Sequence, residues 1–344
     1  MTSMEIQDQA ALLSSDDEAS ETDPFRHRIK MSPLRWLRTY FLTPILVPLR
    51  FTLLITTVFL AWVVSSISLF GLSEDEILNQ PLTGWRKTNK KVASFLGRLC
   101  FRLTGFMIVE TKGQMASKEE ASILVVAPHS TFFDGFVVFW CDLPYIVSRH
   151  ENRKIPLLGK CIEFAQSLFV CREDPQSRQK TVKKIVERAQ DDTEWPQLLI
   201  FPEGSTSNRK ALMSFKPGAF VPGKPVQPVL IRYTYQLIFK TLNNFILNDI
   251  FRYPNEVDTV TWTWNQQHGS KSVLWLTLTQ PFTRASLEFL PVYQPSPEEI
   301  ADPKLFGSNV RQVMAKALQV PTSDLTFEEV KQMYGKKYKS KKRD

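Results

Sequence analysis

Short apolar runs alternate with amphipathic segments over most of the chain, and one much longer apolar stretch precedes them. The short runs are typical of buried strands, whereas apolar residues three and four positions apart are typical of helices packed on a sheet. Strand-like and helix-like segments follow one another from residue 106 onward. This pattern predicts an α/β fold with a mixed, mainly parallel sheet flanked by helices.

The expected strands cover residues 107–111, 122–127, 144–148, 167–171, 197–201, 227–232, 272–279 and 286–291. The expected helices begin at residue 134, cover 155–166, follow residue 177 and cover 309–318. In the third of these helices, Val182, Ile185, Val186 and Ala189 share one face. That face is the one expected against the sheet.

The long apolar stretch covers residues 40–72, and Arg50 is its only charge. Its last 22 residues, 51–72, are uncharged. A helix of that length is about 33 Å long, enough to cross the hydrocarbon core of a bilayer, and longer than a core helix of a soluble domain requires. Pro44 and Pro48 interrupt the pattern. The stretch is therefore expected to be a membrane anchor, either a single span or a re-entrant hairpin that turns at the prolines.

A second membrane-facing element is expected over residues 92–103, where apolar residues repeat at helical spacing between basic ones. Its apolar face comprises Val92, Phe95, Leu96 and Leu99. Two interpretations are open. The helix lies on the membrane beside the anchor, or it packs this face on the core of the domain.

Charge and cysteine usage narrow the possible partners. The chain has 43 Lys and Arg against 35 Asp and Glu, a net charge of +8. Its basic residues flank apolar stretches and no nucleic-acid-binding motif is present, so we expect an anionic membrane surface and no nucleic acid as partner. The four cysteines form no Cys-x-x-Cys pair. We therefore expect no metal, no zinc site and no disulfide framework.

One histidine is placed for chemistry. His129 lies in the turn after the expected strand 122–127, and Asp134 follows five positions later at the start of a helix. The turn allows Asp134 to fold back and accept a hydrogen bond from one imidazole nitrogen, which leaves the other free to act as a general base. The spacing alone leaves a second interpretation open, an incidental loop histidine beside a helix-capping aspartate.

A second motif, Phe201-Pro-Glu-Gly204, ends another expected strand. His-x4-Asp followed by Phe-Pro-Glu-Gly resembles the glycerolipid acyltransferase superfamily. Residues 167–172 and 226–229 resemble the second and fourth blocks of that superfamily, in the expected order. Further segments resemble its lysophosphatidylcholine acyltransferase branch, namely residues 195–197, 215–220, 258–264 and 309–318. The likeness runs from about residue 84 to about residue 327.

The resemblance implies an acyl-CoA-dependent O-acyltransferase that esterifies a lysophospholipid hydroxyl, with acyl-CoA as co-substrate and no cofactor. It implies that His129 is the general base and that Asp134 fixes its tautomer. The expected substrate-binding residues are Arg172, Glu203, Gly204, Ser205 and Arg209. Arg172 is expected to bind a phosphate of the lipid or of CoA, and a surface ion pair with a neighbouring carboxylate is the alternative.

The third block departs from one form of the superfamily pattern. Acyltransferases of lysophosphatidic acid usually continue Phe-Pro-Glu-Gly with Thr-Arg-Ser, whereas this chain continues with Ser205-Thr-Ser207. The missing arginine favours lysophosphatidylcholine or lysophosphatidylethanolamine as acceptor. The alternatives are a lysophosphatidic acid acyltransferase and a non-catalytic membrane-binding relative. No EF-hand loop is present, so calcium regulation is not expected.

The domain organisation follows from these assignments. Residues 1–39 are expected to be an acidic disordered tail and a basic pre-anchor segment, 84–330 the catalytic domain, and 331–344 a basic tail. The repeated letters Arg-Tyr at 232–233 and 252–253 mark 234–253 as a probable insertion within that domain. Lys341 and Lys342, the fourth and third residues counted from the end, resemble a di-lysine retrieval signal, and a solvated basic tail after a plain signal anchor is the alternative. The signal predicts a protein of the endoplasmic reticulum membrane, and of the Golgi in addition, whose active site faces the cytosol.

Overall fold

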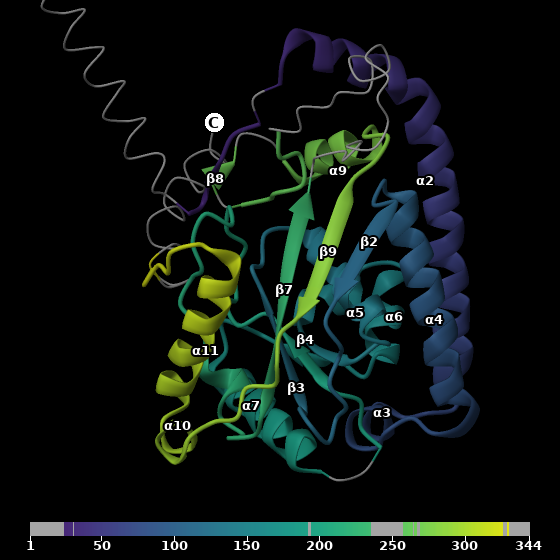
Figure 1. Cartoon of the computed structure of the whole chain (residues 1–344). Helices are drawn as coiled ribbons and strands as arrows, with labels where there is room; N and C mark the ends of the chain where they lie inside the picture. Colours follow the sequence, from purple (N-terminus) through teal and green to yellow (C-terminus); the bar gives the residue numbers. More distant parts are fainter. Residues whose placement is uncertain are drawn as a thin grey trace, which may run out of the picture.

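The computed structural model describes residues 24–29, 31–191, 194–234, 257–263, 265–266, 269–325 and 329. Seven strands form one sheet in the order β2-β9-β7-β3-β6-β4-β5 (Figure 1). Its neighbouring strands are parallel except for β7 and β9, which run antiparallel. The predicted α/β class with a mixed, mainly parallel sheet is confirmed. The expected tails, and the expected insertion beyond Thr234, lie outside the described residues.

The strands of this sheet are β2 (Ile108–Lys112), β3 (Ile123–Ala127), β4 (Tyr145–Arg149), β5 (Leu168–Val170), β6 (Leu198–Ile200), β7 (Val226–Thr234) and β9 (Arg284–Phe289). A separate two-stranded sheet pairs β1 (Arg26–His27) with β8 (Asn265–Gln266). The α-helices are α2 (Pro33–Leu69), α3 (Glu74–Asn79), α4 (Gly84–Leu103), α5 (Phe136–Trp140), α6 (Leu158–Phe164), α7 (Pro175–Gln190), α9 (Ser270–Leu278), α10 (Pro297–Ala301) and α11 (Pro303–Leu318). Three 3₁₀ turns are η1 (Phe132–Gly135), η2 (His150–Lys154) and η3 (Pro217–Ala219).

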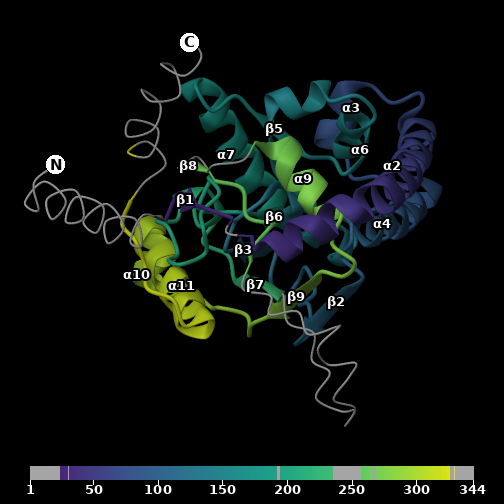
Figure 2. The same ribbon diagram turned by 90° about the horizontal axis from the view of Figure 1, so that it is seen from above.

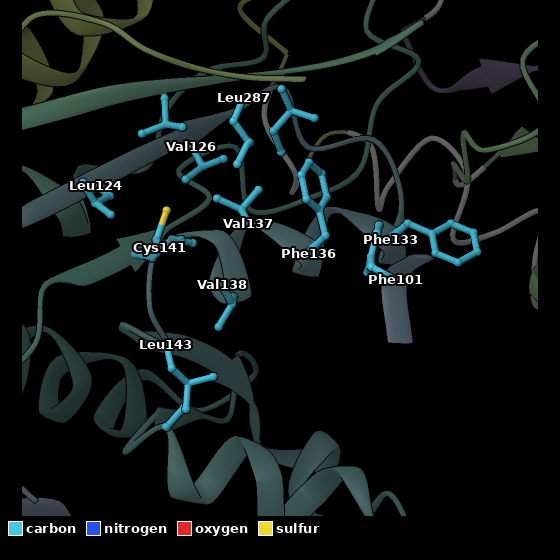
Figure 3. Close-up of a cluster of buried hydrophobic side chains, with 14 of the residues drawn as sticks. Phe101, Leu124, Val126, Phe133, Phe136, Val137, Val138, Cys141, Leu143 and Leu287 are labelled. Atoms are coloured by element: carbon cyan, nitrogen blue, oxygen red, sulfur yellow. The ribbon is translucent and has the colours of Figure 1, made fainter. Parts of the chain in front are cut away.

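Helices cover both faces of the sheet, so its central strands are buried on both sides. In β3 every residue is buried, and successive side chains enter opposite cores. Leu124 and Val126 join the core under α4, α5 and α9, where Phe101 and Phe136 also lie (Figure 3). The alternate residues of β3 join a second core under α7 and α11. Figure 2 shows α2 and α4 on one side of the molecule and α10 and α11 on the other.

The expected strand over 272–279 is wrong, because this segment forms helix α9. Val273, Leu276 and Thr277 are buried at helical spacing on the domain side. Trp275, on another side of the helix, stacks on Trp36 of α2 with ring centroids 6.0 Å apart. Since α9 has apolar neighbours on two sides, its sequence is apolar all round and shows no helical period.

The expected hairpin at the prolines is also wrong. Helix α2 continues from Pro33 to Leu69 through both Pro44 and Pro48. Its first turns lie across one end of the domain and the remainder runs down the side (Figure 1). Each internal proline removes one helical hydrogen bond, which accounts for a bend rather than an end. Within the described residues, α2 is the one helix long and apolar enough to cross a bilayer.

Helix α2 is held to the domain near its beginning, in its middle and at its end. Arg38 donates to Gln280 at 2.9 Å. Arg50 donates to the backbone oxygens of Leu278 and Gln280 at 2.7 and 2.6 Å, just past the carboxyl end of α9. Ser68 accepts a hydrogen bond from Asn89 of α4 at 2.9 Å. The single charge of the apolar stretch therefore serves as a cap for another helix.

Helix α4 buries three small residues together with Phe101, whereas other large apolar residues of the helix are exposed. Ala93, Ser94 and Gly97 are buried, and a Cβ on Gly97 would lie 2.1 Å from the Phe139 ring of α5. Of the predicted apolar face, Phe95 is 62% exposed and Val92 is exposed as well. The face predicted from the sequence is therefore not the core-facing one, which favours the membrane-facing interpretation of this helix.

Two cations are buried together where α3, α4, α6 and α7 meet. Lys90 donates to the side-chain oxygen of Gln166 at 3.1 Å, and Arg188 donates to the backbone oxygen of Gln166 at 2.7 Å. Arg188 also stacks on Trp195 at 3.9 Å. Burial, helped by the charge of Arg188 and then of Lys87, lowers the pKa of Lys90 to about 7. The folded state therefore favours the neutral amine.

This cluster predicts a pH-dependent stability. Between pH 7 and the ordinary lysine pKa of 10.5, the unfolded chain holds a proton that the folded chain lacks, so raising the pH stabilises the fold by up to about 1.4 kcal/mol per pH unit. Lys90→Met should remove this slope from the melting temperature measured at pH 7, 8 and 9. Lys316→Met, at an exposed position of α11 that is not among the charges acting on Lys90, is the control and should keep it. Equal slopes in the parent and Lys90→Met would contradict the prediction.

Candidate active site

The candidate site lies where the parallel strands β3, β5, β6 and β7 end. His129 follows β3, Arg172 follows β5 and Glu203 follows β6, while Tyr233 is near the end of β7. The carboxyl ends of parallel strands meet at one edge of a sheet, which is where open α/β folds collect functional groups. The two sequence motifs are thus brought together by strand pairing between β3 and β6.

His129 and Asp134 form the hydrogen bond that their spacing predicts. The imidazole Nδ1 lies 2.7 Å from the Asp134 Oδ2, which also accepts the backbone N–H groups of Ser130 and Thr131 at 2.5 and 3.0 Å. Asp134 folds back because it completes a capping box with Thr131 at the start of η1. A carboxylate only accepts, so Nδ1 carries the proton and Nε2 presents a lone pair.

The imidazole of His129 is partly exposed to solvent, whereas the carboxylate of Asp134 that bonds to it is fully buried. The side chain of His129 is 25% exposed and that of Asp134 is 0% exposed. Phe201 covers one side of the imidazole, with ring centroids 4.5 Å apart. This arrangement can take a proton from a substrate at Nε2 and stabilise the resulting imidazolium against a buried negative charge.

Glu203 occupies a different position from the one predicted. The sequence predicts that it lines the acceptor site, but its carboxylate is buried and bonded to the protein's own backbone. Oε1 accepts the N–H of His129 at 2.6 Å and Oε2 accepts the N–H of Met213 at 3.2 Å. Burial raises the pKa of Glu203 to about 8, against the lowering effect of these two hydrogen bonds. Through these two hydrogen bonds Glu203 holds the loop that carries His129 in place.

A pocket of about 830 Å³ opens beside His129. Its walls are apolar side chains from the ends of β4, β5 and β6 and from α7. The cations that line it are Arg172, Arg178, Lys183 and Lys216. An apolar interior with several cations suits an amphiphilic anion.

Of the predicted substrate-binding residues, Arg172 and Gly204 line this pocket with His129. Arg172 donates to the backbone oxygen of Gly204 at 3.0 Å. Gly204 has φ of +67°, and a Cβ there would lie 2.9 Å from the side chain of Lys216. Glycine at this position therefore permits both the left-handed turn and the close approach of the lysine.

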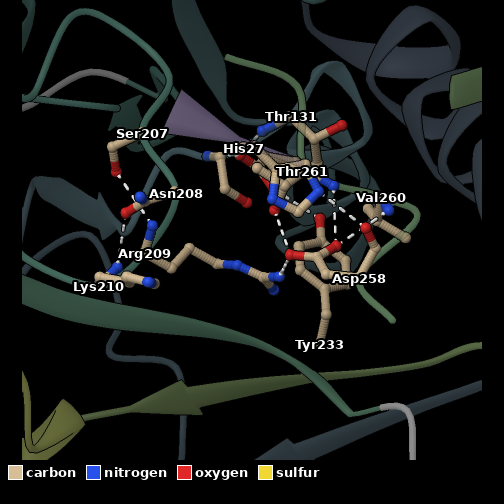
Figure 4. A network of polar contacts seen from close by, with 12 residues as sticks. His27, Thr131, Ser207, Asn208, Arg209, Lys210, Tyr233, Asp258, Val260 and Thr261 are labelled. Carbon is tan, nitrogen blue, oxygen red and sulfur yellow. Dashed lines mark hydrogen bonds and ion pairs between the residues drawn. The ribbon is translucent and has the colours of Figure 1, made fainter. Parts of the chain in front are cut away.

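Ser205 and Arg209 do not line the pocket. Ser205 is buried. Arg209 forms an ion pair with Asp258, and its guanidinium lies 5.2 Å from the ring centroid of Tyr233 (Figure 4). In this structure the Arg209 side chain is engaged within the domain, and its contact with substrate stays a prediction.

The sequence did not identify Tyr233, Asp258 or the segment before α2 as parts of the site. Residues 24–29, expected in the pre-anchor segment, pack on the block that follows Gly204. Asn208 donates its backbone N–H to Pro24 at 2.7 Å, and His27 donates from Nε2 to the backbone oxygen of Asp258 at 2.8 Å. The available signal was the likeness of residues 258–264 to one branch of the superfamily, which carries no contact information.

No cluster of three or more His, Cys, Asp or Glu residues within the described part of the chain could hold a metal ion. The chemistry that the site itself offers is proton transfer at His129 and anion binding in the pocket.

Comparison with known proteins identifies similar chains. Residues 108–232 match the family model named Acyltransferase. The chain is 44% identical over 331 residues to the lysophosphatidylcholine acyltransferase of Drosophila melanogaster, covering 93% of this chain and 58% of that protein. It is 44% identical over 322 residues to the human lysophospholipid acyltransferase LPCAT4, covering 93% and 57% respectively. The chain thus spans less than two thirds of the length of these relatives.

Among solved structures, the 1-acyl-sn-glycerophosphate acyltransferase PlsC of Thermotoga maritima is similar with a TM-score of 0.49 and 20% sequence identity. The match covers 83% of this chain and 96% of that chain.

The contacts of Glu203 predict how its loss affects the site. Glu203→Gln leaves one acceptor oxygen for two backbone N–H groups, so the His129 loop should shift. A displacement of about 1 Å at a reacting group can lower turnover about 100-fold. We expect kcat for the reaction at this site to fall by about that factor while KM for the substrate changes little. Glu194→Gln, an exposed carboxylate, is the matched control. A rise in KM at unchanged kcat would instead indicate direct acceptor binding.

Proposed function

We propose that the chain, which matches the Acyltransferase family model over residues 108–232 and is 44% identical to the relatives above, is an acyl-CoA-dependent lysophospholipid acyltransferase of phospholipid remodelling. One observation carries the proposal. An imidazole with an open Nε2, held at Nδ1 by a buried carboxylate, lies at the edge of a pocket that has apolar walls and several cations. The donor is acyl-CoA, and the acceptor is a lysophospholipid.

The proposed reaction needs one base and no covalent enzyme intermediate, because CoA is a good leaving group. The Nε2 of His129 takes the proton of the glycerol hydroxyl while that oxygen bonds to the thioester carbonyl carbon. The tetrahedral intermediate then breaks its carbon–sulfur bond, and the CoA thiolate takes the proton from the imidazolium. His129 returns to its neutral form. Asp134 holds the tautomer throughout and stabilises the imidazolium.

The pocket supports a phosphate-bearing lipid as substrate. Arg172 lines the same pocket as His129, and a guanidinium can bind a phosphate through two parallel hydrogen bonds. Arg178 and Lys183 of α7 and Lys216 add positive charge to the same pocket. Thr206 stands where acyltransferases of lysophosphatidic acid usually have an arginine. We therefore propose a phosphodiester acceptor, with a choline or ethanolamine head group.

A panel of acceptors tests this function. Purified protein with radiolabelled acyl-CoA should acylate lysophosphatidylcholine or lysophosphatidylethanolamine in preference to lysophosphatidic acid. His129→Ala should lower turnover by about 10²- to 10⁴-fold, the range that general-base catalysis contributes, without loss of fold. Equal or better use of lysophosphatidic acid would support the alternative acceptor. Full activity in a well-folded His129→Ala protein would refute the mechanism.

The docking of α2 supports an anchor that does not cross the membrane. Arg50 and Ser68 both contact the catalytic domain, although about 27 Å of helix separates them. In a spanning helix these ends would lie on opposite sides of the hydrocarbon core. The outward face of α2 is rich in large apolar side chains, among them Phe41, Ile45 and Phe59. We propose that this face and that of α4 rest in one leaflet.

This arrangement predicts that both termini and the active site share one side of the membrane. The proposed compartment is the endoplasmic reticulum, with the cytosolic side carrying the site because acyl-CoA is available there. In sealed microsomes, external protease should digest an amino-terminal tag and a carboxyl-terminal tag without detergent, while a luminal marker stays protected. Protection of either tag would indicate a span and contradict the prediction.

A further inference from the structure

Asp134 has a hydrogen bond that the proposed reaction does not use. The phenol of Tyr233 donates to the Asp134 Oδ1 at 2.6 Å. His129, Ser130 and Thr131 all bond to the other carboxylate oxygen. Tyr233 therefore supports the side of the carboxylate that faces away from the imidazole contact.

The position of the Tyr233 ring is determined by its surroundings. It is 8% exposed and lies near the buried rings of Phe106 and Phe136, with centroids 5.6 and 6.1 Å away. The guanidinium of Arg209 lies over the ring at 5.2 Å. A ring held by packing and by a cation delivers its hydroxyl to one point.

Arg209 is held in turn by an ion pair with Asp258, as Figure 4 shows. Asp258 also accepts the backbone N–H groups of Val260 and Thr261, both at 3.0 Å. A continuous set of contacts thus runs from the loop at Asp258 through Arg209 and Tyr233 to Asp134. The arginine that was expected to bind substrate is part of this support.

We propose that Tyr233 is a positioning residue that sets the orientation and the basicity of His129 through Asp134. This role rests on the proposed function, since it acts on the same base. A donor on Oδ1 draws part of the carboxylate's negative charge away from Oδ2, so the imidazolium is stabilised less strongly than by a carboxylate without it. The hydroxyl thereby moderates how strongly Asp134 stabilises the imidazolium, and it prevents rotation of the carboxylate.

Removing the hydroxyl should have two separable effects. Tyr233→Phe keeps the ring and its packing but removes the donor to Oδ1. In the plot of kcat/KM against pH, the acidic limb should move to higher pH by about one unit, because the imidazolium becomes more stable. Turnover at the optimum should fall about 10-fold, less than for loss of the base itself. A role in packing alone would lower the amount of folded enzyme without moving the limb.

The test is the pH dependence of kcat/KM for the acceptor at saturating acyl-CoA, which reports the base in the enzyme–acyl-CoA complex before the acceptor binds. Tyr293→Phe is the matched control, since the Tyr293 hydroxyl bonds to a different carboxylate, that of Glu299, at 2.7 Å beside α10. The control should keep the parent profile. An active, folded Tyr233→Phe enzyme with an unshifted limb would overturn the proposal.

A second variant keeps the proposal testable if Tyr233→Phe does not fold. Arg209→Gln retains the phenol but removes the cation over its ring, so the limb should shift in the same direction by a smaller amount. No shift in this variant would count against Tyr233 as well. Inactivity of the parent chain towards every lysophospholipid would refute the proposed function instead, so the two failures are distinguishable.

Discussion

The site depends on one costly feature, a carboxylate with no solvent exposure. A buried charge is tolerated only when donors surround it, and Asp134 receives four of them, from His129, Ser130, Thr131 and Tyr233. Each donor requires a particular local structure. One comes from the N-cap of η1, Thr131, two come from the loop that follows β3, and one comes from the end of β7. The requirement to satisfy this charge thus brings together segments that are distant in sequence.

The membrane-facing elements are built on the same framework. Arg50 enters an apolar helix, yet it lies at the carboxyl end of α9, where its charge and its hydrogen bonds are both used. The following loop carries the chain into β9, next to the strand that holds Tyr233. Helix α9 and strand β9 therefore link helix α2 to the strand that carries Tyr233. Burial of small residues in α4 lets these layers approach closely.

The sequence predicted the features that depend on residues close together in the chain. The double-sided burial of β3 and the return of Asp134 onto His129 follow from an apolar run, a turn and a capping position, all visible within a dozen residues. The contacts of Glu203 and Arg209 within the domain were not predicted because their partners, the backbone of Met213 and the carboxylate of Asp258, are set by the tertiary fold. Helix α9 was missed because it packs on the core of the domain on one side and on α2 on another, so its apolar residues do not follow the spacing of a one-sided helix.

The bond between His27 and Asp258 joins positions 231 residues apart. During synthesis residues 24–29 are made long before Asp258, so this contact cannot form until most of the catalytic domain has been synthesised. Contacts of such separation form slowly, because closing a long stretch of chain costs conformational entropy. The docking of residues 24–29 onto the loop at Asp258 is therefore expected late in folding, after helix α2 and most of the sheet between them have formed.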